Sequence, residues 1–337
     1  NIENSVNFHE NVIYYGCGRY AISDLIRHYV NLGVWETIFV PEYYCMDVVH
    51  TILKTGINVV TYKDNPTIVD DQKLILNKFF KDGDVLLRMN FFGLRSYRSN
   101  DRIDIPVIED HSHGLFSNWA LSSNADWCFA SIRKSLPVAD GGILWSPKNN
   151  AIHLQEDAVT NEHKGLVETR YLAMRMKSEY LSTNDVELKR KYLKLFRDTE
   201  ELFTNNSNSL ISPETLILLN KIPSSIDDCK KRNFEYFLSN LDQSHYSILT
   251  PDVNETVFSL VLILENESTR DDLNIYLIKN NIYPAVLWEL DENITSQESM
   301  LVSSTLLSIH IDFRYNLVDI HNMCNILNEY VFYIKNN

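Results

Sequence analysis

The sequence predicts an α/β fold: a three-layer large domain with a mainly parallel sheet, followed by a small C-terminal α+β domain. In the first half, short apolar runs alternate with stretches whose apolar residues recur at helical spacing, a pattern typical of βα units. The chain has 337 residues, enough for two such domains with a core each. We place the large domain at residues 1–244, with a helical segment over 150–244, and the small domain at 245–337.

The strands and helices of the large domain follow from this alternation. The run Thr37 to Val40 is rich in β-branched and aromatic residues, and Pro41 ends it. Predicted strands cover residues 37–40, 58–62, 84–89, 106–110, 127–130 and 142–145, and predicted helices cover residues 20–32 and 47–54. From about Leu166 to Phe203 the chain is charged and helical without proline, and we interpret the charges over 177–201 as a solvated face.

The C-terminal part mixes strands and helices. Thr269 is predicted to cap a helix, because Asp271 and Asp272 then lie in its first turn. Between the two parts, residues 214–241 read as helices that Pro223 interrupts. Predicted strands cover residues 257–264, 283–287 and 306–311, and a last helix covers residues 317–333.

Composition excludes several classes of function. Acidic residues outnumber basic ones, 45 to 31, so nucleic acid is a poor partner. No apolar run reaches the ~18–20 residues that span a bilayer, and no signal peptide opens the sequence, so we expect a cytoplasmic protein without a membrane partner. The cysteines contain no CxxC pair, which disfavours a structural zinc site or a disulfide framework. They are Cys17, Cys45, Cys128, Cys229 and Cys324.

Three features of the first half suit one cofactor site. Gly16-Cys17-Gly18-Arg19 precedes a predicted helix, whose first N–H groups can bind a phosphate. Asp110 ends a predicted strand at the edge where α/β folds bind ligands, and Lys134 follows it by 24 residues, just beyond another strand. A carboxylate beside a pyridine nitrogen and a lysine that bonds an aldehyde are what pyridoxal phosphate (PLP) requires. Each feature also has an ordinary structural explanation when it is taken alone. The segment 16–19 could be a tight turn before a helix, Asp110 a helix cap and Lys134 a solvated surface charge.

These motifs resemble the DegT/DnrJ/EryC1/StrS family of PLP-dependent aminotransferases over nearly the whole chain. The resemblance rests on GCGRYAI (16–22), IFVPEYYC (38–45), VIEDHSHG (107–114) and SIRKSLPVADGGILW (131–145), with support from IYPAVLW (282–288) and LSIHIDFRYNLVDI (307–320). It implies the fold type I of PLP-dependent transferases and a homodimer.

The resemblance also implies the role of each site residue. Lys134 is the expected Schiff-base lysine and proton carrier, Asp110 the partner of the pyridinium nitrogen, and His113 a contact of the ring's phenolic oxygen. Ser131, Cys17, Gly18 and Arg19 are expected around the phosphate, and Tyr44 or Tyr43 on the face of the ring.

Some positions depart from the family pattern. Cys45 falls where many members place the stacking aromatic residue, and Cys17 where a hydroxyl residue is common. The Gly-x-Asn-x-Arg run that helps to build the shared site of a dimer is not found, and residues 212–237 occupy its region.

Substrate and metal ligands are less defined by the sequence. We name Asn90, Trp288 and Arg314 as substrate candidates, Arg314 because a guanidinium matches a carboxylate. A core position for Trp288 and a structural ion pair for Arg314 stay open. His111 and His113 alternate like a metal pair, but without a third ligand nearby we expect no metal.

The resemblance implies amino transfer from a donor, glutamate, to a keto-sugar or related ketone in surface-polysaccharide or secondary metabolism. A PLP-dependent lyase, racemase or cyclising enzyme on the same fold remains an alternative, as does a non-catalytic regulatory protein. A Rossmann dehydrogenase is disfavoured, because GCGRYA lacks the third glycine of the dinucleotide fingerprint.

Overall fold

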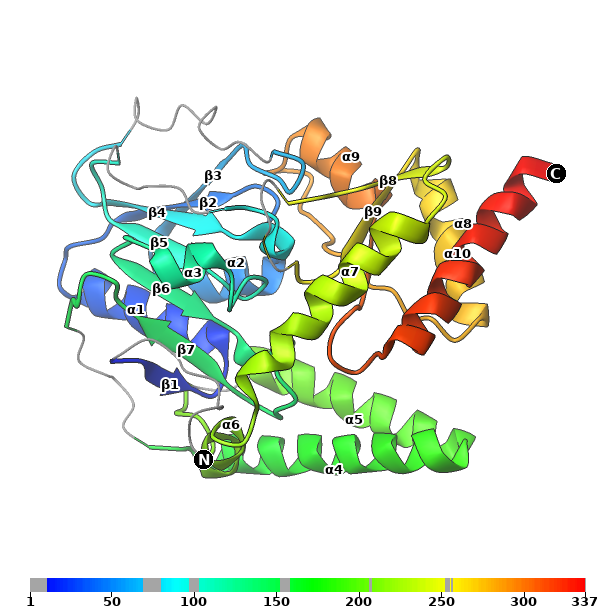
Figure 1. Cartoon of the computed structure of the whole chain (residues 1–337). Helices are drawn as coiled ribbons and strands as arrows, with labels where there is room; N and C mark the ends of the chain where they lie inside the picture. Colours follow the sequence, from blue (N-terminus) through cyan, green and yellow to red (C-terminus); the bar gives the residue numbers. More distant parts are fainter. Residues whose placement is uncertain are drawn as a thin grey trace.

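A seven-stranded sheet forms the centre of the larger part of the molecule (Figure 1). The computed structural model describes residues 11–68, 80–96, 103–151, 158–205, 208–251, 255 and 257–336. The strand order is β1-β7-β6-β5-β4-β2-β3. Strands β2 to β6 run parallel, β7 pairs antiparallel with β6, and β1 pairs antiparallel with β7. The strands are β1 (Ile13–Tyr15), β2 (Thr37–Pro41), β3 (Asn58–Tyr62), β4 (Asp84–Met89), β5 (Val107–Asp110), β6 (Trp127–Ala130) and β7 (Gly142–Trp145).

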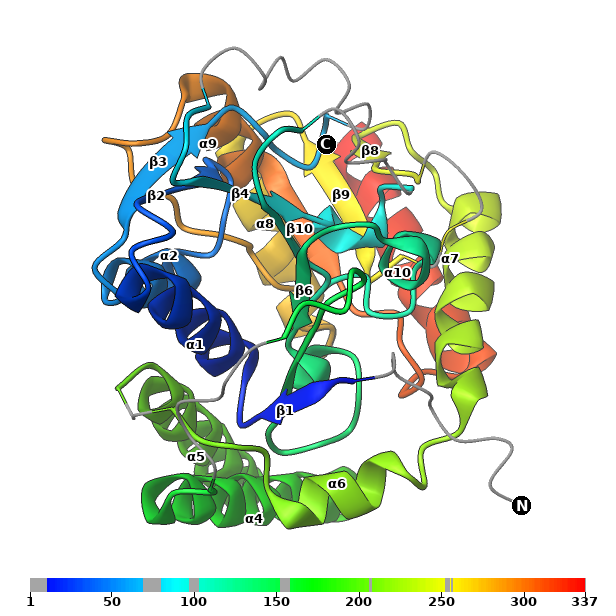
Figure 2. The same ribbon diagram turned by 90° about the vertical axis from the view of Figure 1, so that its left-hand side faces the viewer.

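Helices flank this sheet, so its central strands are buried from end to end. The first helix, α1 (Gly18–Asn31), packs on β1, β6 and β7, and α2 (Met46–Leu53) packs beside α1 and β3 (Figure 2). Ser117 caps the short helix α3 (Asn118–Ser122), since its hydroxyl accepts a hydrogen bond from the N–H of Ala120. Two short 3-10 turns follow strand ends, η2 (Phe91–Gly93) after β4 and η3 (Ile132–Lys134) after β6.

A long helical hairpin follows β7 and extends beyond the sheet along the bottom of Figure 1. It consists of α4 (Asn161–Thr183) and α5 (Val186–Asn205), and Asn184 closes α4 in the left-handed conformation, with φ 56°. The helix α6 (Pro213–Leu219), the 3-10 turn η4 (Ser224–Asp227) and α7 (Asp228–Asn240) lead to the C-terminal part.

The C-terminal part is built on an antiparallel sheet in the order β10-β9-β8. Its strands are β8 (Tyr246–Ile248), β9 (Leu260–Leu264) and β10 (Leu306–Ile309), and its helices are α8 (Glu267–Lys279), α9 (Gln297–Thr305) and α10 (Leu317–Asn336). Helix α7 packs against α10, although it precedes residue 245. The domain boundary at 245 stays a prediction.

Several predicted elements need correction. Asn266, and not Thr269, caps α8, since its side chain accepts the N–H of Thr269. Residues 283–287 form one isolated bridge, Ala285 to Ser308, in place of a strand. Strand β1 was not predicted, because three residues are too few to show alternation. The helix α9 was missed as well, and its last residue, Thr305, directly precedes β10.

One hydrophobic core runs through both parts of the molecule. The backbone N–H of Phe258, near β9, donates to the carbonyl of Phe92 in η2 at 2.7 Å. Glu42, just after β2, accepts a hydrogen bond from the hydroxyl of Ser299 in α9 at 2.7 Å. These contacts fix the C-terminal part over the ends of the parallel strands. Within the described residues, the structure has no helix with both the length and the apolar character needed to cross a bilayer.

Candidate active site

A cavity lies where the parallel strands β4, β5 and β6 end, at the edge where α/β folds bind ligands. Met89, Asp110 and Phe129, the last or next-to-last residues of these strands, line it. Eight residues singled out from the sequence also line it: Lys134, Asp110, Ser131, Cys17, Gly18, Arg19, Tyr44 and Trp288. The fold therefore brings together residues that are far apart along the chain.

Lys134 ends the turn η3, and its Nζ lies 3.4 Å from Nε2 of His113. Burial lowers the pKa of His113 well below 6.5, and the positive charges of Lys134 and Lys230 lower it further. The imidazole is therefore neutral. With its proton on Nδ1, it accepts a hydrogen bond from the lysine ammonium through Nε2. His113 is thus placed to hold the lysine side chain.

An aromatic wall fixes the orientation of the His113 ring. The ring stacks on Phe258 with centroids 4.4 Å apart and on Trp288 with centroids 5.4 Å apart. Nζ of Lys134 lies 5.9 Å from the centre of the Trp288 indole. Trp288 therefore lines the cavity, and its packing against other aromatic rings agrees with the core role that the sequence left open.

Asp110 presents a carboxylate at the end of β5. Its Oδ1 accepts the backbone N–H of Ser112 at 2.8 Å, and its Oδ2 accepts the hydroxyl of Tyr44 at 2.6 Å. Burial and the neighbouring carboxylate raise the pKa of Tyr44 well above 10, so the phenol stays protonated and continues to donate. Each oxygen keeps a lone pair for a further donor, such as a protonated ring nitrogen.

The chain at the start of α1 packs tightly against the start of β7 and against Ser131. A Cβ at Gly142 would lie 2.2 Å from the carbonyl carbon of Cys17, and one at Gly18 would lie 3.2 Å from Cβ of Ser131. Burial raises the pKa of the Cys17 thiol, which is therefore neutral. The helix start at Gly18, with the positive end of the helix dipole, is held beside Ser131 as an anion site requires.

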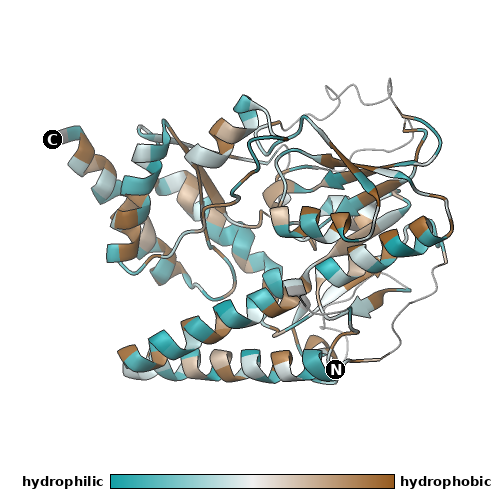
Figure 3. Cartoon of the chain, turned by 180° about the vertical axis from the view of Figure 1, so that it is seen from behind, coloured by the Kyte–Doolittle hydropathy of each residue, from teal (hydrophilic) through white to brown (hydrophobic). Residues whose placement is uncertain are grey.

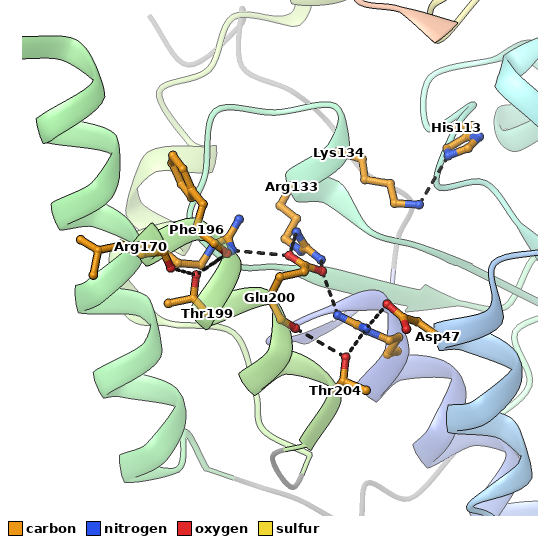
Figure 4. Close-up of polar contacts among 11 residues, drawn as sticks. Asp47, His113, Arg133, Lys134, Arg170, Phe196, Thr199, Glu200 and Thr204 are labelled. Carbon is orange, nitrogen blue, oxygen red and sulfur yellow. Dashed lines mark hydrogen bonds and ion pairs between the residues drawn. The ribbon is translucent and has the colours of Figure 1, made fainter. Parts of the chain in front are cut away.

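Three charged residues of the cavity were missed by the sequence analysis, namely Arg133, Glu200 and Asp47. Arg133, next to Lys134, donates hydrogen bonds through both terminal nitrogens to Glu200 of α5, at 2.6 and 2.9 Å (Figure 4). Arg19 donates to the same carboxylate at 2.9 Å. The interpretation of residues 177–201 as a solvated face therefore misses the ion pairs of Glu200, whose side chain is 42% exposed. A signal existed for Arg133, since it adjoins the predicted lysine, but charge alone does not distinguish Glu200 from its exposed neighbours.

Two substrate candidates do not line this cavity. Asn90 donates to the hydroxyl of Ser117 at 3.0 Å and lies beneath Gly114. Arg314 donates through two nitrogens to Asp312, each at 2.7 Å. This geometry is that of the structural ion pair, so a role of Arg314 or Asn90 in substrate binding stays a prediction.

The two histidines of the H-x-H pair point in different directions. His113 faces Lys134, whereas Nε2 of His111 lies 3.0 Å from Oε2 of Glu109. Glu109, His111 and Cys128 are buried and could share an ion, but the guanidinium of Arg88 lies 3.8 Å from the same Glu109. A positive group beside the carboxylate makes this cluster a poor metal site.

The residues of the cavity fit PLP in the chemistry of their donors. Asp110 would pair with the ring nitrogen, Lys134 would bond the aldehyde, and the start of α1 with Ser131, Arg19 and Arg133 would hold the phosphate. His113 has a buried Nδ1 without a hydrogen-bond partner among the described residues. The side chains therefore offer each group of that cofactor an oppositely charged or hydrogen-bonding partner.

Comparisons with family models and with curated proteins find no relative of this chain. No protein-family model matches the sequence. No curated protein matches it either.

Solved structures, however, match nearly the whole chain. A sugar aminotransferase described as putative, Spr1654 from Streptococcus pneumoniae, matches in its apo form with a TM-score of 0.64 and 12% identity, over 97% of this chain and 88% of its own. PseC from Helicobacter pylori, an aminotransferase involved in the biosynthesis of pseudoaminic acid, has a TM-score of 0.62 and 12% identity over 94% and 85%. A DegT/DnrJ/EryC1/StrS aminotransferase from Brucella abortus has a TM-score of 0.58 and 13% identity over 95% and 86%. The chain therefore has the fold of these aminotransferases, as the sequence predicted.

Proposed function

We propose that the protein is a PLP-dependent aminotransferase that moves an amino group from an amino acid to a keto-sugar or related ketone. The observation that carries this proposal is the convergence of the Lys134 amine and the Asp110 carboxylate on one cavity at the ends of β5 and η3. The solved structures compared above are described as aminotransferases, and Spr1654, described as a putative sugar aminotransferase, is also known in PLP and PMP forms.

Each residue of the cavity has a chemical task in this reaction. When bound, PLP supplies an electron-accepting ring that stabilises a carbanion on the substrate. Asp110, fixed by Tyr44 and Ser112, keeps a proton on the ring nitrogen. Lys134 would bond the aldehyde through Nζ and, once released from that bond, would move a proton between the substrate's α-carbon and the cofactor. Neutral His113 orients this amine because it accepts a hydrogen bond from it.

Glutamate is the amino donor that we propose. The resemblance to the aminotransferase family supports this choice, and the excess positive charge of Arg19, Arg133 and Arg170 beside the cavity would attract an anionic amino acid. The partly buried Trp288, which stacks on the His113 ring, also lines the cavity.

We also propose a cytoplasmic homodimer. All five cysteines are free thiols, which suits a reducing compartment. Large apolar side chains are exposed on the α4–α5 hairpin and on α6, among them Leu193, Leu202 and Ile217. Figure 3 shows hydrophobic positions in brown along the hairpin at the bottom of the view. A second copy of the chain would cover such residues.

The decisive experiment traps the cofactor on the protein. The protein is incubated with PLP, reduced with borohydride and digested, and peptide mass spectrometry is expected to find pyridoxyl phosphate on Lys134 and none in Lys134→Ala. Incubation with PLP and L-glutamate is then expected to release one 2-oxoglutarate per site. No adduct on Lys134 would overturn the cofactor assignment. An adduct without an oxo acid from any amino acid would favour the lyase or racemase alternative.

A further inference from the structure

We propose that Glu200 is a displaceable plug over a subsite for a phosphate monoester, built by Arg19 and Arg133, and that a phosphate dianion replaces its carboxylate. The identity of the natural ligand, the phosphate of PLP, rests on the proposed function. The anion subsite itself rests only on the charges and contacts described below.

The carboxylate of Glu200 lies between guanidinium groups from three separate elements (Figure 4). Arg133 of η3 binds it through two nitrogens, Arg19 of α1 through one at 2.9 Å, and Arg170 of α4 lies 3.5 Å away. Burial would raise the pKa of Glu200, but Arg133, Arg19 and Arg170 lower it to about 2. Glu200 is thus an anion at every physiological pH.

The Glu200 side chain is more exposed to solvent than the arginine side chains that surround its carboxylate. The side chains of Arg19, Arg133 and Arg170 are 8, 14 and 11% exposed, whereas that of Glu200 is 42% exposed. Guanidinium groups that are largely removed from water need an anion beside them. The Glu200 carboxylate is far more solvent-accessible than the three guanidinium groups that bind it, so it can leave by a change of rotamer once another anion arrives.

The charge balance favours a dianion. Three guanidinium groups face two carboxylates, those of Glu200 and Asp47, so one positive charge is left over. Exchange of the Glu200 carboxylate for a phosphate dianion would neutralise the cluster. Arginine also matches phosphate geometrically, because its planar fork can donate two parallel hydrogen bonds.

The position of the cluster links it to the candidate active site. Arg133 directly precedes Lys134 on η3, and Arg19 lies in the first turn of α1, where the helix dipole is positive. With Glu200 in place the shared cavity has a volume of about 70 Å³, whereas small-molecule sites usually have about 300–1,000 Å³. Movement of the half-exposed Glu200 side chain is therefore the simplest way to admit a phosphorylated ligand.

The test measures binding of inorganic phosphate by calorimetry in the Lys134→Ala background, in which no bond to PLP can form. Glu200→Gln is expected to bind phosphate about tenfold more tightly than the parent, a change of about 1.4 kcal/mol. Glu201→Gln removes the same charge from the next, exposed residue of α5 and is the matched control, with the parent's affinity expected.

Two outcomes would overturn the proposal: equal phosphate affinity in Glu200→Gln and Glu201→Gln, or no phosphate binding to either. If Glu200→Gln does not fold, Arg133→Gln decides, because loss of the subsite should weaken phosphate binding at least tenfold. The proposed function can fail independently. In that case Lys134 forms no adduct with PLP, while Glu200→Gln still binds phosphate more tightly than the parent and Glu201→Gln do.

Discussion

Nζ of Lys134 lies 3.4 Å from Nε2 of a His113 ring that is stacked between Phe258 and Trp288. Because the imidazole is buried and neutral, it can act only through this hydrogen bond and not as a cation. The pair therefore sets the position of the amine, and it also makes the stability of the protein depend on pH.

Acid should destabilise the protein through His113. The pKa of His113 in the folded protein is lowered below its value in the unfolded chain. As the pH falls, the unfolded chain therefore binds a proton before the folded protein does. The stability that is present above pH 6.5 is lost as the pH falls below this value. We expect the free energy of unfolding to fall by about 1 kcal/mol per pH unit below 6.5 from this residue.

Urea denaturation at pH 7.5 and 5.5 measures this loss. His113→Phe keeps the ring stack and should show a smaller difference between the two pH values. His310→Gln should also reduce the difference between the two pH values, because burial lowers the pKa of His310 as well. An unchanged difference in His113→Phe would contradict the assignment.

Removal of the Tyr44 hydroxyl should be more costly than removal of the hydroxyl next to it. Tyr44 donates to the buried carboxylate of Asp110, whereas Tyr43 donates to the carbonyl of Leu287. We expect Tyr44→Phe to lose about 1.5–3 kcal/mol of unfolding free energy and Tyr43→Phe about 0.5–1.5 kcal/mol. Chemical denaturation of both variants provides the comparison, and the opposite order would refute it.

Gly142 should tolerate no side chain. An added Cβ would lie 2.2 Å from the backbone of Cys17, so Gly142→Ala must move the start of α1 or fail to fold. Gly165 in α4 has open space around it, and Gly165→Ala should stabilise the helix by up to about 1 kcal/mol. Thermal melts of both variants measure the contrast, and a neutral Gly142→Ala would disprove the tight packing.

Asp110 should matter for the reaction more than for attachment of the cofactor. Asp110→Asn should still give the Lys134 adduct after borohydride reduction, because the lysine is untouched. The rate of 2-oxoglutarate release from glutamate should fall by about 10²-fold or more, since a preorganised charge is lost. A rate within a few-fold of the parent would remove Asp110 from the proposed site.

The proposed homodimer can be broken from the α4–α5 hairpin. Leu193→Glu and Leu202→Glu place charges on exposed apolar positions of α5 and should shift the mass measured by light scattering from dimer to monomer. Phe332→Ser, on the exposed face of α10, is the control and should leave the mass unchanged. A monomeric parent protein would remove the dimer proposal.

The sequence by itself determined the elements whose pattern is local. The parallel strands read correctly because they are short apolar runs, and Asp110 and Lys134 could be placed because each lies at or just beyond the end of such a run. In a parallel sheet these ends meet at one edge, so their convergence followed from topology alone.

Only the tertiary structure decided the charge partners of the site. Glu200 and Arg19 are 181 residues apart, and nothing in the helical pattern of α5 separates Glu200 from its exposed neighbour Glu201. The difference arises when α5 docks on the large domain and one of the two carboxylates meets the buried guanidinium groups. Burial and electrostatic pairing depend on how elements pack, and one-dimensional periodicity carries no record of that packing.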